Sequence, residues 1–211
     1  LKCWNATLDQ TLARPWRRMA DSIVLAVPDD ATSLKDAFDE GCAKCQDAGI
    51  TTLRINLAID YAEPKEAWPL ELALKAGGPQ QLEILGPLCG SARLGDVHLE
   101  AKMPSTLRLC NVKCGNVCLD GTGCSLEKCE ARSVEVSENG ACAVRNCRVT
   151  QSRIGVQLRG PVAMDSTEIL DAVIGVSLHG NLDVSLHNCQ VLRCSAAGLV
   201  IHFEMPSEKE A

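Results

Sequence analysis

The stretch "SLHNCQVLRC" at residues 185–194 decides the fold, because it is one copy of a pattern that recurs along the chain. Each copy has an apolar residue, a cysteine three positions later and a second apolar residue two positions after that, with threonine replacing one cysteine. The clearest copies are Leu107, Cys110 and Val112; Leu126, Cys129 and Ala131; Val144, Cys147 and Val149; Met164, Thr167 and Ile169; and Leu186, Cys189 and Val191, after a weaker copy at Leu82, Leu85 and Pro87. The clear copies start 19, 18, 20 and 22 residues apart, a period typical of solenoid proteins.

A second apolar segment follows each copy, as "NVCL" (116–119), "SVEV" (133–136), "GVQL" (155–158), "GVSL" (175–178) and "GLVI" (198–201). These segments alternate apolar and polar residues, which is the period of a half-buried strand. The first apolar residue and the cysteine are an odd number of positions apart, so both point inward only if the chain turns between them. Asn146 and Asn188 lie at that point, and asparagine tolerates the left-handed conformation of a tight corner. Each repeat is therefore predicted to be a strand, a sharp corner, a second strand, a looser turn and a third strand.

Repeats of this kind predict an all-β solenoid, a right-handed parallel β-helix of about seven coils. Equivalent residues of successive coils then lie about 4.8 Å apart. This spacing predicts one interior column of Cys110, Cys129, Cys147 and Cys189, and a second of Cys124 and Cys142 that Val162 and Val184 continue. We expect these cysteines to fill a narrow core as reduced thiols, although the spacing also allows disulfides between adjacent coils.

An N-terminal capping helix is predicted at about residues 33–48. Ser33 and Asp36 form a capping box, and one helix face carries the apolar residues Leu34, Ala37, Phe38, Cys42 and Cys45. Such a helix would cover the open end of a solenoid core. The segments "PLELAL" (69–74) and "QLEILGP" (81–87) are predicted to be the next strands.

Residues 22–63 resemble the opening of pectin-lyase-like β-helix proteins, in which a strand, a helix and a second strand precede a Gly-x-Tyr-x-Glu segment. Tyr61 and Glu63 match its Tyr and Glu, whereas Ile59 and Asp60 replace the glycine region. The resemblance covers residues 22–203 and implies the fold rather than one activity, since similar coils occur in pectinesterases, polygalacturonases, polysaccharide lyases and F-box adaptor proteins. We divide the chain into an N-terminal arm (1–21), a β-helix domain (22–203) and a polar C-terminal tail (204–211).

The composition argues against several classes of protein. The 211 residues carry a net charge of −6 and no long basic run, which does not fit a nucleic-acid-binding protein. No apolar run approaches the roughly 20 residues of a transmembrane segment. The 13 cysteines are an odd number with a single CxxC, at Cys42 and Cys45, and the four histidines are scattered, so we predict no metal and no cofactor. Reduced cysteines indicate an intracellular, reducing compartment.

No catalytic centre is predicted on the coils. Enzymes of the resembling families use clustered carboxylates, or an arginine with bound calcium, on the outer face of one sheet. The predicted outward columns are Arg108, Glu127, Arg145, Asp165 and His187; Asn111, Glu130, Arg148, Glu168 and Gln190; and Asp120, Ser137, Arg159, His179 and His202. None places two carboxylates on adjacent coils, as a general acid–base pair or a calcium site requires. The pectinesterase-like "LARPWRR" (12–18) and the polygalacturonase-like "LHG" (178–180) lack their partner motifs.

Binding to other proteins is the remaining prediction. A flat outward stripe of small residues is expected from Thr106, Ser125, Ala143, Ala163 and Ser185, and the arm carries an apolar series of Trp4, Leu8, Leu12 and Trp16. The polar tail is expected to be too short to cover the last coil, whose strand edges need protection. We predict a non-catalytic scaffold or interaction module, an accessory subunit or adaptor of a larger protein assembly. The alternative is a carbohydrate-active or polysaccharide-binding protein, although aromatic residues, 3% of the chain, are few for stacking on sugars.

Overall fold

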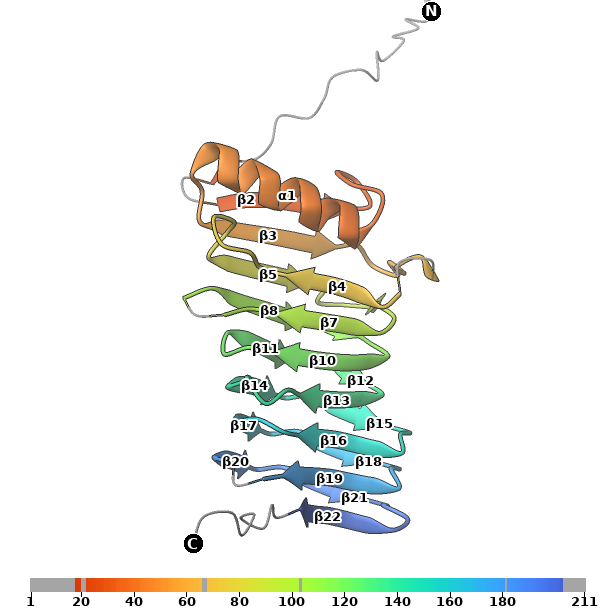
Figure 1. Ribbon diagram of the computed structural model, residues 1–211. Helices are drawn as coiled ribbons and strands as arrows, with labels where there is room; N and C mark the ends of the chain where they lie inside the picture. The colour runs from red at the N-terminus through yellow and green to blue at the C-terminus, as the bar shows by residue number, and fades with distance from the viewer. Residues whose placement is uncertain (1–17, 20–21, 66–67, 103, 181, 203–211) are drawn as a thin grey trace, which may run out of the picture.

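The computed structural model describes residues 18–19, 22–65, 68–102, 104–180 and 182–202, and these form one stack of parallel strands with a helix across one end (Figure 1). Three sheets make up the stack. The nine-stranded sheet contains β1 (Arg18–Met19), β2 (Ser22–Val27), β3 (Thr52–Leu57), β5 (Gln81–Leu85), β8 (Thr106–Cys110), β11 (Cys124–Glu127), β14 (Cys142–Arg145), β17 (Val162–Asp165) and β20 (Val184–His187). The seven-stranded sheet contains β4 (Leu70–Ala73), β7 (Val97–Glu100), β10 (Asn116–Asp120), β13 (Ser133–Val136), β16 (Ile154–Leu158), β19 (Ile174–His179) and β22 (Ala197–His202). The six-stranded sheet contains β6 (Ala92–Arg93), β9 (Val112–Lys113), β12 (Glu130–Ala131), β15 (Arg148–Thr150), β18 (Glu168–Leu170) and β21 (Gln190–Leu192).

From β5 onward each coil contributes one strand to each sheet, and strands of successive coils pair in parallel. Leu126 pairs with Val144 and Val144 with Met164, so one inward position repeats from coil to coil. The side chains at such positions are almost completely buried and fill the space between the three sheets. The predicted parallel β-helix of about seven coils with an N-terminal helix is therefore confirmed.

The first corner of the coil is formed by a single residue in the left-handed conformation. In five successive coils this residue has a φ between 50° and 59°, at Asn111, Lys128, Asn146, Ser166 and Asn188. The sharp corner predicted from the two asparagines is thus present, and lysine and serine also occupy it. The turn after the second strand, expected to be looser, is also tight in the last coils, where Gln151, Asp171 and Arg193 have a φ of 56–59°.

The predicted register is wrong for the coil that contains Leu107. Leu107 pairs with Cys124, and Leu109 pairs with Leu126, so this coil is shifted by two residues relative to the sequence alignment. Cys110 therefore faces outward beside Glu127 and is only half-buried. The prediction failed because Leu107 and Leu109 both point inward, and hydrophobic periodicity alone cannot distinguish them. Aligning Asn111 with the other corner asparagines would have given the observed register.

The remaining cysteines largely follow the predicted columns. Cys129 and Cys147 are 1% and 3% exposed and lie in line with Thr167, while Cys124 and Cys142 begin the second column. Three buried thiols, those of Cys124, Cys129 and Cys142, donate to carbonyl oxygens of the preceding coil; the distance from Cys129 to the Leu109 carbonyl is 3.4 Å. The twelve cysteines in the described residues are all free. Reduced cysteine is thus a small core residue whose weak donor satisfies a backbone acceptor.

Cys189 occupies its predicted place in the first column but is only half-buried. It belongs to the last described coil, so coils lie on one side of it alone. The expectation of nearly complete burial is therefore wrong at this position. Burial in a solenoid requires a neighbouring coil on both sides.

The helix α1 (Leu34–Ala48) lies across the N-terminal end of the stack (Figure 1). Its N-cap is Ser33, whose Oγ accepts a hydrogen bond from the Asp36 backbone N–H at 3.0 Å, as predicted. Gly49 ends the helix in the left-handed conformation. The buried face consists of Leu34, Ala37, Phe38, Gly41 and Cys45, whereas Cys42 is half-buried. Gly41 was missing from the predicted face; a Cβ there would approach Leu53 to 2.6 Å, so glycine allows the close packing.

Candidate docking surface

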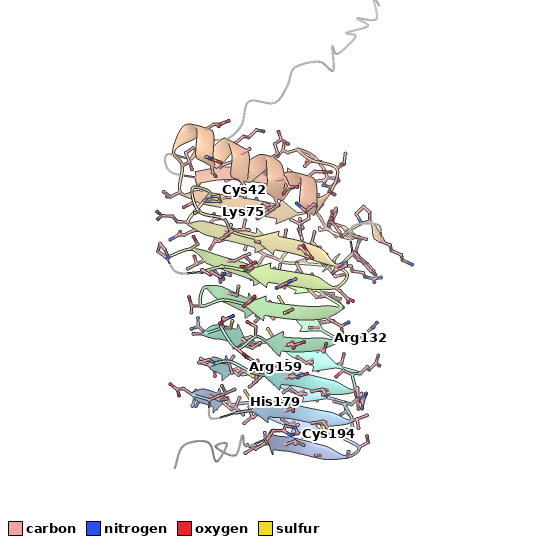
Figure 2. The ribbon with its side chains drawn as sticks, viewed as in Figure 1. Cys42, Lys75, Arg132, Arg159, His179 and Cys194 are labelled. Atoms are coloured by element: carbon pink, nitrogen blue, oxygen red, sulfur yellow. The ribbon has the colours of Figure 1, made fainter. Side chains whose placement is uncertain are left out.

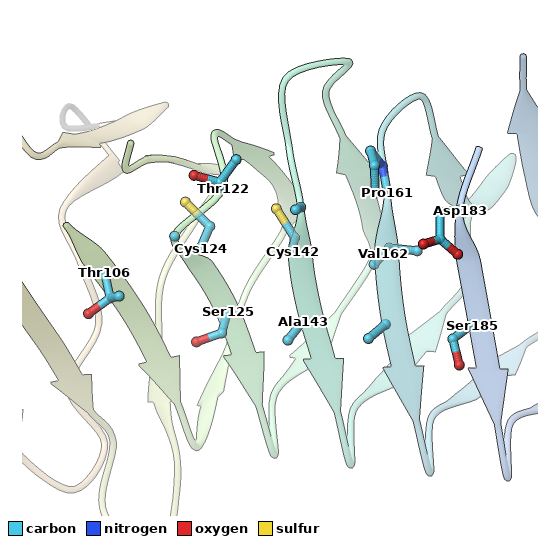
Figure 3. A pocket seen from close by; sticks show the side chains of 13 residues that line it. Thr106, Thr122, Cys124, Ser125, Cys142, Ala143, Pro161, Val162, Asp183 and Ser185 are labelled. Carbon is cyan, nitrogen blue, oxygen red and sulfur yellow. The ribbon is translucent and has the colours of Figure 1, made fainter. Parts of the chain in front are cut away.

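The small-residue stripe lies on the outer face of the nine-stranded sheet. Ser125 on β11, Ala143 on β14, Ala163 on β17 and Ser185 on β20 pair in register across four successive strands. Figure 3 shows the side chains of Ser125, Ala143 and Ser185 in line. They alternate with the inward residues of the same strands, so the fold itself points them away from the core.

Thr106 does not belong to the same column. It pairs with Gln81, and the position in line with Ser125 is occupied by Arg108. This is the two-residue register shift again, and it corrects the prediction that Thr106 continues the stripe. Thr106 nevertheless lies at one end of the same surface, beside Gly123.

A shallow groove of about 530 Å³ runs along this stripe, across five coils (Figure 3). A second row of small residues from the turns before the strands widens it: Gly123, Ala141 and Pro161, followed by Asp183. This second row was not predicted from the sequence, because its members lie in turns, where small residues are common. Among the lining residues Asp183 is the only charged one and none is aromatic.

A row of alternating charges borders the groove toward the N-terminal coils. Arg54 contacts Glu83 at 2.6 Å, Glu83 contacts Arg108 at 3.4 Å, and Arg108 is also hydrogen-bonded to Glu127. Hydrogen bonding to Glu127 raises the pKa of Arg108, so this guanidinium stays charged. The predicted alternation of charge is present, but Arg108 contacts Glu127 diagonally, because Cys110 is the residue in register with it.

The other two predicted columns differ in accuracy. Beside the first corner, Lys113 rather than Asn111 pairs with Glu130, which pairs in turn with Arg148. On the seven-stranded sheet the predicted order is correct, and Figure 2 shows Arg159 and His179 one above the other on its outer face. His179 stacks on His202 with ring centroids 4.4 Å apart.

One pair of carboxylates does lie on adjacent coils, contrary to prediction. Glu100 on β7 is in register with Asp120 on β10. Glu100 contacts Lys102 at 3.2 Å, and Asp120 accepts a hydrogen bond from Ser137 at 2.5 Å. The pair was not predicted because the predicted column begins at Asp120, one coil after Glu100.

A second hollow, of about 200 Å³, lies on the same sheet. Its centre is a column of Glu71, His98, Cys118 and Glu135 on successive strands. Burial and the nearby Glu135 raise the pKa of Cys118, which keeps it a protonated, weakly nucleophilic thiol. Nowhere in the described part of the chain do three His, Cys, Asp or Glu side chains come close enough together to hold a metal ion.

The four apolar residues of the N-terminal arm, Trp4, Leu8, Leu12 and Trp16, lie outside the described residues. Arg18 and Met19, at the end of the arm, form β1 and pair antiparallel with β2. The third tryptophan, Trp68, is 43% exposed beside Gly95. In the described part of the chain, no helix is long and apolar enough to cross a membrane.

Comparison of the chain with protein-family models, with curated proteins and with solved structures finds no match. The fold and the surfaces described above are therefore the basis for any statement about function.

Proposed function

We propose that this protein is a non-catalytic β-helix scaffold, an accessory subunit or adaptor that binds other proteins along the groove of the nine-stranded sheet. The observation that carries the proposal is the groove itself, a long surface of small, almost uncharged side chains held in register by four paired strands. A partner chain can approach such a surface closely without desolvating charges. The resemblance of residues 22–63 to pectin-lyase-like proteins supports the scaffold part of this proposal, because it implies the β-helix fold and no particular activity.

The chemistry of the lining favours a protein partner over a sugar polymer. Sugar-binding clefts present aromatic rings for stacking, and the residues that line this groove include none. Its hydroxyl groups, on Thr106, Ser125 and Ser185 among others, suit hydrogen bonds to a polypeptide backbone. The free thiols of the described cysteines support a reducing, intracellular location, because disulfides would form between suitably placed cysteines elsewhere.

The groove is tested by filling it. In native extracts the wild-type chain should elute with a larger assembly, and Ala143→Arg with Ala163→Arg should release it, because two long charged side chains occupy the floor. Gln190→Arg on the six-stranded sheet is the matched control and should leave the assembly intact. A wild-type chain that elutes alone, or a filled groove that stays bound, contradicts the proposal.

A carbohydrate-active protein is the second candidate, favoured by the adjacent carboxylates Glu100 and Asp120. Two such groups are the minimum for glycoside hydrolysis. Both are already engaged, by Lys102 and Ser137 respectively, which weighs against a catalytic role. Turnover of a plant or microbial polysaccharide that is lost in both Glu100→Gln and Asp120→Asn would establish this candidate and displace the scaffold proposal.

A further inference from the structure

A histidine and a cysteine lie next to each other in the second hollow, on the outer face of the seven-stranded sheet. His98 on β7 is in register with Cys118 on β10, and these two strands are adjacent in the stack (Figure 1). Both side chains line the hollow of about 200 Å³. Both residues are half-buried, so an ion from solvent can reach the pair.

Neither side chain is used by the fold. The Nε2 atom of His98 is completely buried and has no hydrogen-bond partner among the described residues. The thiol of Cys118 likewise makes no hydrogen bond within the described part of the chain. By contrast, the thiols of Cys124, Cys129 and Cys142 donate to backbone carbonyls. A buried nitrogen without a partner costs free energy unless a ligand satisfies it, so the pair has unused capacity to bind one.

The chemistry of the two donors selects the ligand. A thiolate sulfur and an imidazole nitrogen bind soft ions such as copper(I) and leave hard ions such as magnesium and calcium to oxygen ligands. Zinc prefers a tetrahedron of ligands, and no three His, Cys, Asp or Glu side chains of the described residues converge. Copper(I) has a filled d shell and is satisfied by two donors on opposite sides. With bonds of about 2.3 Å to sulfur and about 2.0 Å to nitrogen, as for filled-shell zinc, a linear arrangement separates the donor atoms by about 4.3 Å. Paired strands hold in-register side chains about 4.8 Å apart, which suits this separation.

We propose that His98 and Cys118 form a copper(I)-binding site on the outer face of the seven-stranded sheet. The thiol loses its proton to water as the sulfur–copper bond forms, a nitrogen lone pair of His98 supplies the second bond, and no electron is transferred. The complex of a thiolate, a neutral imidazole and a monovalent cation has no net charge, so its burial costs less than that of an isolated ion. Glu71 and Glu135 flank the pair in the same column and attract the incoming cation. No metal was predicted from the sequence, because the pairing of β7 with β10 becomes evident only in the fold.

Two neighbouring pairs of thiols elsewhere in the described residues are less suitable for an ion. Cys42 and Cys45 are one helical turn apart on α1, but Cys45 is 1% exposed and its thiol donates to the carbonyl of Thr52 at 3.8 Å. Cys129 and Cys147 lie inside the core and are 1% and 3% exposed. The pair in the hollow is accessible and has no competing hydrogen bond. Copper binding there is independent of the proposed function, because the groove lies on another sheet.

Protection of individual thiols tests the proposal. One equivalent of copper(I), added to the reduced chain without oxygen, should slow the alkylation of Cys118 by iodoacetamide about tenfold or more, because the reactive thiolate is bound. Mass spectrometry should find the rate at Cys110 unchanged. Cys110 is the matched control: it is half-buried and faces outward, with Leu85 and Glu127 in register beside it where Cys118 has a histidine. An unchanged rate at Cys118 overturns the proposal.

Two variants of His98 show whether the imidazole takes part. His98→Ala should abolish the protection of Cys118 and raise the dissociation constant for copper(I), measured by competition with bicinchoninate, at least about tenfold. His98→Cys supplies another soft donor and should retain the protection. Circular dichroism should show that both variants are folded. Protection of Cys118 that persists in His98→Ala, or protection of Cys42 and Cys45 in its place, contradicts the two-ligand site.

Discussion

The two ends of the stack present the same kind of apolar interior in opposite environments. Under α1, Leu25 and Leu53 are 1% and 0% exposed, whereas Leu199 and Ile201 at the other end are about half exposed, at 51% and 45%. Both ends carry apolar residues at the inward positions of their strands. Burial in this protein therefore depends on whether a neighbour is present, and residue type alone does not determine it.

The covered end is also held by specific polar contacts. Glu63, which is 3% exposed, accepts hydrogen bonds from the Tyr61 hydroxyl and from the Leu34 backbone N–H. The Tyr61 hydroxyl oxygen also accepts from that N–H, at 2.9 Å. Burial and the adjacent Glu63 raise the pKa of Tyr61, so the phenol remains protonated and can donate. The Tyr and Glu that carry the family resemblance thus fix the first turn of the capping helix.

The largest contrast should come from truncating one leucine at each end. Leu34→Ala removes a completely buried side chain from the inner face of α1 and should lower the free energy of unfolding by about 2–5 kcal/mol. Leu199→Ala should cost less than about 1 kcal/mol in the monomer, because half of that side chain is already in water. Urea denaturation at submicromolar concentration measures both. Equal losses would mean that the C-terminal end is covered.

The polar contacts beneath the helix should contribute less. Glu63→Ala removes the acceptor of two buried donors and should cost about 1–3 kcal/mol. Glu63→Gln keeps one acceptor oxygen of similar shape and serves as the control. Hydrogen exchange should show faster opening of α1 in the alanine variant. Unchanged exchange of the helix amides would rule out the anchoring role.

A similar comparison applies within the cysteine column. Cys147→Ser places a hydroxyl in a site 3% exposed and should cost about 1–3 kcal/mol. Cys189→Ser, in the half-buried position of the last coil, should cost less than about 0.5 kcal/mol. Thermal unfolding distinguishes the two. A larger effect at Cys189 would place this residue in a covered environment.

The reactivity of the thiols should also depend on burial, so that exposed cysteines are alkylated before buried ones. Burial raises the pKa of Cys124 and of Cys142 to about 12, so both should resist alkylation in the folded chain. Cys89 is exposed and should react first. Mass spectrometry after brief treatment with iodoacetamide identifies the modified residues. Early modification of Cys124 would show that the coils open readily.

The smallest expected effect is a pH dependence at the open end. Partial burial, followed by the neighbouring His202, lowers the pKa of His179 below its usual value of about 6.5. The unfolded chain then binds more protons than the folded chain, so stability is lost as the pH falls through about 6.5. Imidazole signals in an NMR titration report this pKa. In His202→Gln the pKa of His179 should rise, and an unchanged value would remove His202 as a cause.

The features that repeat along the sequence could be predicted from it, and those that do not repeat could not. The coils, the corner residues, the capping helix and most of the small-residue stripe follow from periodicity and local conformation. The register of the coil that contains Leu107 was predicted wrongly, because two apolar positions satisfied the same pattern. The predicted positions of Cys110, Thr106 and Arg108 were wrong for the same reason.

The lining of the groove was only half predictable for a related reason. Ala141, Pro161 and Asp183 join it through the stacking of turns. Hydrophobic periodicity describes strands and carries no information about how turns align in space. The adjacency of Glu100 and Asp120 likewise depends on pairing between coils, which the sequence expresses only once the register is known.

In the coils, each strand pairs only with the equivalent strands of the neighbouring coils. This pairing determines the order in which the coils should unfold. Ser125 pairs with Ala143, and Ala143 with Ala163, so partners are 18 and 20 residues apart in the chain. In such a one-dimensional array, unfolding of the terminal coil removes a single interface between coils, and the next coil then becomes the exposed terminal coil. A monomer should therefore unzip from the C-terminal end, and limited proteolysis should give a series of fragments that shorten by about one coil at a time.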